Sequence, residues 1–454
     1  MQQGDAFDEE NFFKVERKDG STYEGPLDDK NEPHGKGVVT KNDGEYEYQG
    51  DWVHGEKEGE GVEKDTLKGE EYNGEFKQSF RHGKGKLVRS DGYEYEGDWA
   101  NNLPHGNGKE KFQTGDEYEG DFVSGFRQGY GSLKLKTGGY YNGQWEQGQR
   151  HGKGVEIFPN GDKYEGEYKK GLRNGKGKFG KTSGASYDGE WENGIKNGQG
   201  VEIHDDGSKY DGAFINGLRN GQGVLETKTG LRYSGEWKDN RRHGTGKQRY
   251  ADESEYVGGF VNGLKEGNGS LSKPDGSSYT GIWKSNKKHG NGIQIRSDGS
   301  KYEGTFADNT RHGKGVYVYE NGDVYEGEWK KGMIEGKGRF TTKKSGDIYE
   351  GQWKSDKKHG KGLFRKQNGE RYEGDFKNGK KEGYGRMDFG KGKVYEGQWR
   401  NNKPDGLGKL LLGTGNNLKE AYDGQWKEGR KEGKGTYKFN NGDVYDGDWV
   451  RNRM

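Results

Sequence analysis

The sequence predicts an all-β fold, an elongated single-layer antiparallel meander of about 19 stacked β-hairpins. The pattern Tyr-x-Gly recurs 19 times, and from Tyr95 through Tyr325 its tyrosines fall every 23 residues. A second aromatic residue follows four positions later in every unit except the first, which has Leu27, and Gly-x-Gly then follows in every unit except the last. A repeat this short cannot bury a core alone, so each unit must pack on its neighbours.

Each unit has the pattern of one β-hairpin, as residues 141–163 illustrate. Tyr141, Gly143 and Trp145 alternate, as they must to lie on one face of a strand. The chain then turns at 147–149 and returns through Gly-x-Gly. It reverses again at Asn160-Gly161, a dipeptide that predicts a type I′ turn.

A register follows as a hypothesis, in which Trp145 lies opposite Gly152 and Gly143 opposite Gly154. The missing glycine side chains would let rings rest on the neighbouring backbone, and this aromatic ladder would replace a conventional core. The predicted ladder includes six tryptophans: Trp99, Trp145, Trp191, Trp237, Trp283 and Trp329.

Composition alone would suggest a disordered chain, with 25% hydrophobic and 34% charged residues. Aromatic residues nevertheless make up 13% and stand at fixed offsets, which favours a folded chain. Lys and Arg total 77 against 76 Asp and Glu, so the global basicity of a nucleic-acid binder is missing. The absence of cysteine fits a reducing cytoplasm.

We expect an N-terminal segment, 1–22, that contributes one half-hairpin strand, followed by a repeat array over 23–454. Irregularities are expected at 349 and at 409–421, where the spacing of the motif tyrosines changes. The N-terminus lacks the pattern of a secretory signal, and no stretch approaches a membrane span. Unpaired strands at the two ends could recruit partner strands or support edge-mediated self-association.

From residue 99 to 329 the second aromatic alternates between tryptophan and a smaller ring. Size complementarity between successive hairpins would explain this alternation, and so would duplication of a two-repeat unit. The sequence leaves both explanations open.

These residues resemble the MORN repeat, whose consensus is matched almost residue for residue by Tyr164-Glu165-Gly166-Glu167-Tyr168 and by Gly175-Lys176-Gly177. The resemblance covers essentially the whole chain and implies a row of hairpins. It also implies that enzymatic activity, where present in the family, comes from a separate fused domain. No part of this sequence is left over for such a domain.

Two apparent motifs are better explained by the repeat. Residues 175–182 satisfy the phosphate-loop pattern, but another hairpin follows them where a helix should begin, so we expect no nucleotide or other cofactor. Eight histidines share one position before Gly-x-Gly and are therefore expected to be spread along the array rather than to converge on a metal or a catalytic site.

Two kinds of surface residue are candidates for partner or lipid contact. Basic pairs crowd the first turn, and they could engage anionic lipid headgroups or acidic protein tails by many weak contacts. Apolar β-branched residues lie on the outward face and could meet a partner. Ordinary solvated surface and cover by neighbouring side chains are the alternatives. The candidates are Arg241, Arg242, Lys287, Lys288, Lys357, Lys358, Val155 and Ile157.

We therefore expect a non-enzymatic scaffold that docks other proteins in a cytoskeletal assembly. The family resemblance implies the location, because MORN proteins without a catalytic domain are similar to radial-spoke-head components of cilia and to protist cytoskeletal proteins. A ciliary axoneme in the cytoplasm is the first expectation. The alternative is a membrane-apposed adaptor that binds anionic phospholipids through a basic turn edge.

Overall fold

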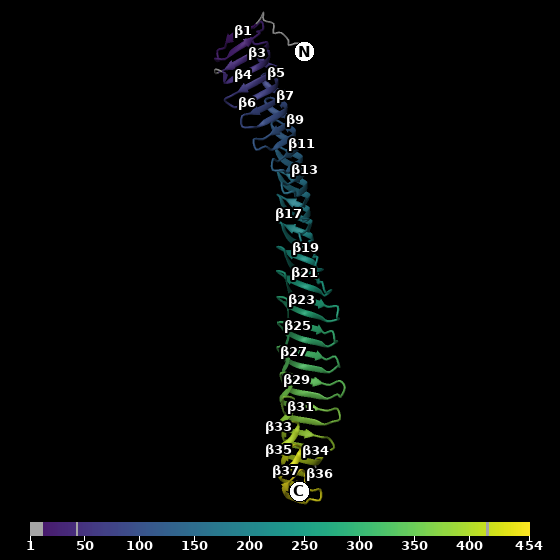
Figure 1. Ribbon diagram of the computed structural model, residues 1–454. Coiled ribbons are helices and arrows are strands. Elements are labelled where there is room, and N and C mark those ends of the chain that lie inside the picture. Colours follow the sequence, from purple (N-terminus) through teal and green to yellow (C-terminus); the bar gives the residue numbers. More distant parts are fainter. Residues whose placement is uncertain (1–11, 42–43, 415–416) are drawn as a thin grey trace. The chain divides into compact units, whose positions relative to one another are not determined.

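The computed structural model describes residues 12–41, 44–414 and 417–454. The chain divides into two compact units, Met1–Lys228 and Thr229–Met454, which we call unit 1 and unit 2. In both units the strands follow one another in chain order and each is antiparallel to the next (Figure 1). The fold class predicted from the sequence, an all-β meander of stacked hairpins, is confirmed.

The strands of unit 1 alternate between a first strand that carries Tyr-x-Gly and a return strand that carries Gly-x-Gly, and they begin with a lone return strand. They are β1 (Phe13–Glu16), β2 (Thr22–Gly25), β3 (Gly35–Lys41), β4 (Tyr46–Val53), β5 (Glu56–Asp65), β6 (Glu70–Lys77), β7 (Phe80–Arg89), β8 (Glu94–Ala100), β9 (Leu103–Lys111), β10 (Glu117–Val123), β11 (Phe126–Lys134), β12 (Tyr140–Glu146), β13 (Gln149–Ile157), β14 (Lys163–Lys169), β15 (Leu172–Gly180), β16 (Ser186–Glu192), β17 (Ile195–Ile203), β18 (Lys209–Ile215) and β19 (Leu218–Glu226).

Unit 2 repeats the same alternation and ends on a first strand. Its strands are β20 (Arg232–Lys238), β21 (Arg241–Arg249), β22 (Glu255–Val261), β23 (Leu264–Ser272), β24 (Ser278–Lys284), β25 (Lys287–Ile295), β26 (Lys301–Ala307), β27 (Thr310–Val318), β28 (Val324–Lys330), β29 (Met333–Thr341), β30 (Ile348–Lys354), β31 (Lys357–Arg365), β32 (Arg371–Lys377), β33 (Lys380–Asp388), β34 (Lys393–Arg400), β35 (Lys403–Thr414), β36 (Asn417–Lys427), β37 (Arg430–Lys438) and β38 (Val444–Trp449).

The register within a hairpin is set by a bulge that the sequence did not predict. Gly143 does pair with Gly154, as expected, but Trp145 pairs with Arg150 rather than with Gly152. The return strand carries two extra residues here, and Gly152 enters the left-handed region with a φ of 54°. Gly152 instead pairs with Tyr168 of the next hairpin. The predicted Trp145–Gly152 pair is therefore wrong.

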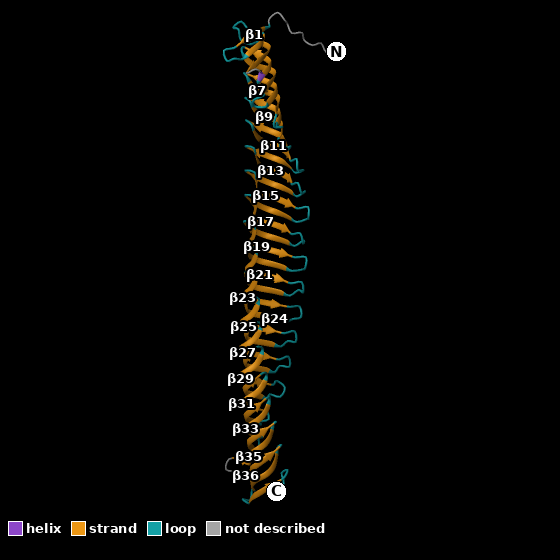
Figure 2. Ribbon diagram, turned by 60° about the vertical axis from the view of Figure 1, so that its left-hand side comes forward, coloured by secondary structure: helices purple, strands orange, loops and turns teal. Residues whose placement is uncertain are grey.

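The two turns of each repeat differ in type, and the type I′ turn is the other one. Gln147 and Gly148 have φ values of 48° and 75°, and two positive values in succession define type I′. At Asn160-Gly161 only the glycine is left-handed, and the amide N–H of Phe158 donates to the carbonyl of Asp162 at 2.8 Å. This is a three-residue loop, so the type I′ prediction for Asn160-Gly161 is wrong. Figure 2 shows these longer loops and the tight turns on opposite sides of the strands.

The glycine pair of each hairpin is covered by a tyrosine ring of the same hairpin. The Tyr141 hydroxyl donates to the carbonyl of Gln144 at 2.9 Å, so the ring lies flat over Gly143 and Gly154. A Cβ atom added to either glycine would come within 2.6 Å of this ring. Glycine is thus required at both positions by close approach of a ring.

The second aromatic residue of a repeat packs against the preceding hairpin. The indole N–H of Trp145 donates to the Gly131 carbonyl at 3.1 Å. Its ring meets Tyr118 of the preceding hairpin at 5.2 Å and Tyr141 of its own at 5.3 Å, both edge to face. Such pairs contribute about 0.5–1.5 kcal/mol each beyond their buried area, and they recur through both units.

The six tryptophans predicted for the ladder are at most 6% exposed. The two expected irregularities lengthen a hairpin without interrupting the ring contacts. Tyr325 meets Trp353 at 5.4 Å across the first, and Tyr395 meets Trp426 at 5.2 Å across the second. Residues 415–416 of the second irregularity, and 1–11 of the N-terminal segment, lie outside the described residues.

Candidate interaction surfaces

The ring-bearing face of the sheet also holds one cation from each of the basic pairs at the first turn. Arg242 lies 5.5 Å from the centre of the Phe260 ring, Lys288 lies 5.0 Å from Tyr279 and Lys358 lies 4.9 Å from Tyr349. Burial lowers the pKa of the Lys288 and Lys358 ammonium groups. These three candidate contact residues are half-buried and pack on the ladder.

The other residue of each pair points the opposite way and is exposed. Arg241, Lys287 and Lys357 stand eight positions after the motif tyrosine, at the first residue of the return strand. Alternation along the strand separates them from the adjacent ring-packed cation. The structure therefore splits the predicted basic turn into a packed row and an exposed row.

In unit 1 the exposed row is apolar. Its members, at the same eighth position, are 39–58% exposed. They form what we call the apolar edge: Phe80, Leu103, Phe126, Leu172, Ile195 and Leu218. Several of them lie against the next turn, as where the Leu103 Cδ2 atom lies 3.7 Å from the place a Cβ of Gly125 would occupy. Only Gln149 interrupts the row between Phe80 and Leu218.

In unit 2 the same position is mainly basic. We call this row the basic edge, and its members are Arg241, Lys287, Lys357, Lys380, Lys403 and Arg430, all exposed. The ion pair found for this row joins Lys287 Nζ to Asp308 Oδ1 at 3.4 Å. The basic residues at the turn were predicted from the sequence but the apolar edge was not, although large apolar residues recur at the eighth position.

The outward face carries the two apolar candidates of unit 1 in half-buried positions. Val155 lies opposite Asn142 and Glu165, and Ile157 opposite Tyr140 and Lys163. Polar neighbours on both sides cover much of each side chain.

Unit 2 offers a more open outward patch. The cross-strand row Val257, Ser270, Thr280 and Ile293 has no charge, and Lys247 and Glu303 flank it. Val257 is 49% exposed and Ile293 37%.

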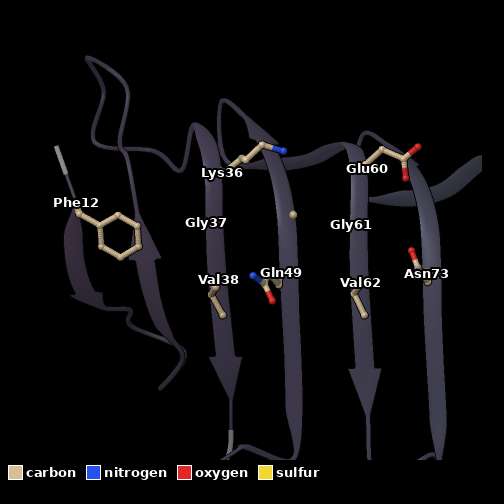
Figure 3. Close-up of a pocket in the computed structure, with 10 residues that line it drawn as sticks. Phe12, Lys36, Gly37, Val38, Gln49, Glu60, Gly61, Val62 and Asn73 are labelled. Atoms are coloured by element: carbon tan, nitrogen blue, oxygen red, sulfur yellow. The ribbon is translucent and has the colours of Figure 1, made fainter. Parts of the chain in front are cut away.

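A groove of about 1000 Å³ hollows the outward face at the first repeats of unit 1 (Figure 3). Phe12 borders one end, Val38 and Val62 lie on its floor, and glycine backbone forms much of the rest. Lys36 and Glu60 are the titratable groups among its lining residues. The lining of this groove brings no set of catalytic groups together.

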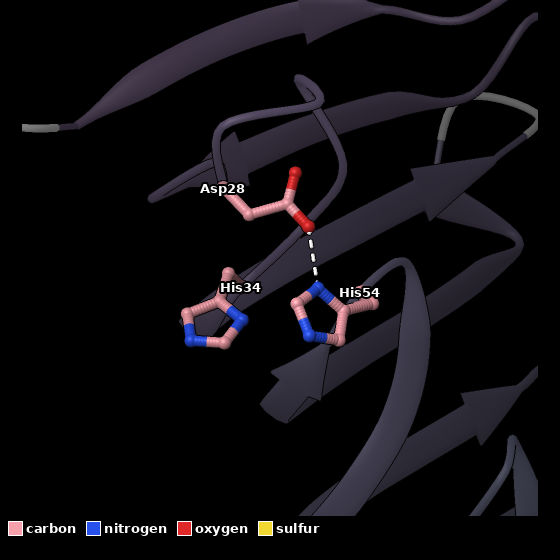
Figure 4. A group of neighbouring side chains, drawn as sticks. All are labelled: Asp28, His34 and His54. Atoms are coloured by element: carbon pink, nitrogen blue, oxygen red, sulfur yellow. Dashed lines mark hydrogen bonds and ion pairs between the residues drawn. The ribbon is translucent and has the colours of Figure 1, made fainter.

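Three potential metal ligands converge at the N-terminal end of unit 1 (Figure 4). The Asp28 Oδ2 atom lies 2.7 Å from His54 Nδ1, and the His34 and His54 ring centres are 5.4 Å apart. His34 was expected to be one of the histidines that do not converge, and for this residue the expectation is wrong. The convergence depends on the loop that carries Asp28, whose conformation no repeat pattern specifies.

The phosphate-loop pattern at 175–182 falls across β15 and the turn before β16. No helix begins there. The segment therefore lacks the helix N-terminus that a phosphate cradle requires. Within the described residues, no helix has the length and apolarity to traverse a bilayer.

The repeat can now be compared with known families. The model of the MORN repeat matches 18 consecutive segments, and these cover most of the chain. The chain belongs to the MORN repeat family. The matched segments are 29–46, 48–66, 72–92, 95–117, 118–140, 141–163, 164–186, 187–209, 210–232, 233–255, 256–278, 279–301, 302–324, 325–346, 349–371, 372–394, 395–417 and 422–444. The tyrosine and glycine positions of the MORN repeat are those that form the ladder described above.

No curated protein matches the chain. Among solved structures, the TCP domain of Drosophila melanogaster SAS-4 in complex with a proline-rich motif of Ana2 is 11% identical, over 39% of this chain and 85% of that one, with a TM-score of 0.20. The G-box domain of the microcephaly protein CPAP is 14% identical, over 44% of this chain and 100% of that one, with a TM-score of 0.18. At such TM-scores the likeness carries no functional argument.

Proposed function

We propose that this MORN repeat protein is a non-enzymatic scaffold that docks other proteins through its turn edges in a cytoskeletal assembly, with the ciliary axoneme as the proposed location. The apolar edge of unit 1 is the observation that carries the proposal. MORN repeats are the basis of a structural or binding protein, and the exposed rows decide which kind of partner such a protein can hold.

The apolar edge has the properties of a protein-docking surface. Large exposed apolar side chains gathered in one place on a soluble protein mark contacts with partners. Successive hairpins are about 10 Å apart, two strand spacings, so the six side chains recur at this spacing except where Gln149 stands between Phe126 and Leu172. Phe80 and Phe126 add exposed aromatic side chains, a residue class enriched at the centres of protein interfaces.

The experiment replaces Phe80, Phe126 and Leu172 together by glutamine. Glutamine is compatible with this turn, because Gln149 occupies the same position in the intervening repeat. We expect the triple variant to remain folded and to lose cytoskeletal partners when tagged protein is recovered from ciliated cells and quantified by mass spectrometry. The matched control is Arg241→Gln, Lys287→Gln and Lys357→Gln at the same position in unit 2, which should retain those partners.

Recovery of the same cytoskeletal proteins by both triple variants would refute docking through the apolar edge. Fluorescence imaging of the wild type in the same cells tests the location separately. A diffuse cytoplasmic signal with no axonemal enrichment would remove the ciliary part of the proposal and leave the docking part standing.

A second candidate function rests on the basic edge of unit 2. Six exposed cations at equivalent turns could contact a membrane rich in anionic phospholipids, which would make the protein a membrane-apposed adaptor. Flotation with phosphatidylcholine vesicles, with and without phosphatidylserine, tests it. Binding should require phosphatidylserine, weaken as salt rises, and disappear in the Arg241, Lys287 and Lys357 triple variant.

A further inference from the structure

Among the described residues, the first two hairpins hold a cluster of potential metal ligands that recurs in no other pair of neighbouring repeats. Asp28 comes from the loop between β2 and β3, His34 from the residue before β3, and His54 from the turn between β4 and β5 (Figure 4). One oxygen or nitrogen atom from each side chain lies within 4.8 Å of the others. We propose that Asp28, His34 and His54 bind a zinc ion that ties the first hairpin to the second.

The carboxylate is already oriented as a ligand. Its Oδ1 atom accepts the backbone N–H groups of Lys30 and Glu32, both at 2.9 Å, and this leaves Oδ2 directed at His54. The Asp28 side chain is only 9% exposed. Hydrogen bonds of this kind fix ligand orientation around protein-bound metals and strengthen binding.

The loop that carries Asp28 is itself held in place. A bridge joins Leu27 to Pro33, and the amide N–H of Asp28 donates to the Glu32 carbonyl at 2.9 Å. The carboxylate therefore projects from a closed loop rather than from a free segment, so less ordering is required when an ion binds.

His54 is the residue that makes this pair of repeats different. It stands at the left-handed position of a type I′ turn, with a φ of 48°. The equivalent position in the other repeats has Gln, Asn, Ser, Lys, Asp, Glu or Arg and never histidine. His34, by contrast, occupies the common histidine position before Gly-x-Gly, so a repeat residue acquires a ligand role only where His54 and Asp28 face it.

The donor set selects the class of metal. Two imidazole nitrogens and one carboxylate oxygen suit zinc, which commonly takes three protein ligands and leaves a fourth position to water. Magnesium and calcium prefer oxygen alone. Zinc at about 2 Å from each ligand needs the ligand atoms roughly 3.3 Å apart, and the exposed rings of His34 and His54 can reach that separation by side-chain rotation.

Isothermal titration calorimetry tests the proposal, with zinc chloride titrated into the full chain produced without a polyhistidine tag. We expect one binding site per chain. His54→Asn should weaken binding about tenfold or more, and so should His34→Ala and Asp28→Asn. Asparagine is the residue of several equivalent turns, such as Asn193, and it tolerates the left-handed backbone, so His54→Asn should fold normally.

The matched control is His105→Ala. His105 stands at the common position, and its Nδ1 atom accepts the N–H of Ser124 at 3.4 Å, in the turn equivalent to that of His54. Zinc affinity should be unchanged in this variant. No zinc binding by the wild type, unchanged affinity in His54→Asn, or an equal loss in His105→Ala would each overturn the proposal.

Hydrogen exchange supplies a second readout. Because the ion would join the loop of the first hairpin to the turn of the second, zinc should slow exchange of backbone amides over 26–35 and 54–56 in the wild type. The His54→Asn variant should show no such change. Protection spread evenly through unit 1, or present in the variant, would contradict the assigned site.

Discussion

Units 1 and 2 build the same turn on the same ladder and then place different chemistry on it in most repeats. At the eighth position after the motif tyrosine, unit 1 has Phe126 and Leu172 where unit 2 has Lys357 and Lys380. The hairpin register around these residues is the same, since Val123 pairs with Phe126 and Lys354 with Lys357. The ladder therefore does not constrain the residue type at this position, and the exposed row can vary to suit a partner.

The neighbouring position shows the opposite behaviour. One residue further along, Arg150 in unit 1 and Lys381 in unit 2 both lie about 5 Å from a ladder ring, at 5.3 and 4.8 Å. Both units keep a cation here because it packs between the rings. Adjacent residues in one strand thus serve two purposes, one in the fold and one on the surface.

The largest expected effect tests whether the two ladders are equivalent. Trp145→Ala in unit 1 and Trp283→Ala in unit 2 should each lower the local free energy of unfolding by about 3–5 kcal/mol, because each removes a buried ring and an indole hydrogen bond. Native-state hydrogen exchange of the neighbouring hairpins measures both. A small loss in one unit and a large loss in the other would show that the ladders differ in strength.

Glycine replacement should have a somewhat smaller effect. In Gly154→Ala the new methyl would lie 2.4 Å from the Tyr141 hydroxyl oxygen, and in Gly292→Ala 2.6 Å from that of Tyr279. Such overpacking costs about 1–3 kcal/mol in each unit. Gly180→Ala is the control for clash, because nothing lies within 4 Å of the added methyl and Gly180, like Gly154 and Gly292, does not have a left-handed backbone.

Much of this ladder could be predicted from sequence because its determinants are local. Tyr141, Gly143 and Trp145 alternate, and the pairing of Gly143 with Gly154 follows from counting residues between them. The bulge at Gly152 could not be predicted, since it depends on two residues that leave the register and on the Gln144 side chain, which accepts the Lys153 N–H at 2.8 Å. The type I′ turn was predicted for the wrong loop because Gln147 adopts a left-handed backbone, which glutamine in a sequence does not indicate.

The surfaces were harder to predict than the fold. The pair Arg241-Arg242 looks like a single basic patch in the sequence, and only the strand register shows that the two side chains leave on opposite faces. The cluster of Asp28, His34 and His54 depends on a loop outside the regular spacing. Sequence periodicity therefore predicts the structural positions that recur in every repeat, but not a cluster of side chains that occurs in one place.

A pH-dependent effect should distinguish the units by their packed cations. Burial lowers the pKa of Lys265 and of Lys381 in unit 2 to about 8, whereas Arg150 and Arg173 hold the equivalent places in unit 1. The unfolded chain binds more protons than the folded one between about pH 8 and the ordinary lysine pKa of 10.5. The free energy of unfolding of unit 2 should therefore rise with pH in that window.

Hydrogen exchange, corrected for intrinsic rates, at pH 8 and about pH 9.5 measures this rise. The range stops below the ordinary tyrosine pKa of about 10, so ionisation of unfolded tyrosine is only partial. This ionisation acts in the opposite direction, because burial raises the pKa of Tyr141 and Tyr279 to about 12. Unit 1 should change less, because most of its packed cations are arginines, although burial lowers the pKa of its Lys57. A rise of equal size in both units, or one that is not reduced in Lys381→Met together with Lys265→Met, would contradict the assignment to these lysines.

The smallest effect on stability is expected at the edges themselves. Phe126→Gln and Lys357→Gln should each change the free energy of unfolding by no more than about 0.5 kcal/mol, because both side chains are exposed and neither contacts the ladder. Chemical denaturation measures this. A loss of 2 kcal/mol or more, on the scale of about 1–3 kcal/mol for ladder changes, would mean that the edge position is part of the fold after all.

The indole N–H groups of Trp145 and Trp191 each donate to the preceding hairpin, and the ring contacts that stabilise a repeat are made with its immediate neighbours. A segment of 23 residues can then be gained or lost from within a unit without creating a new kind of contact. The length of such a protein can therefore change by whole repeats. A change in one repeat leaves the contacts among the repeats on either side of it intact.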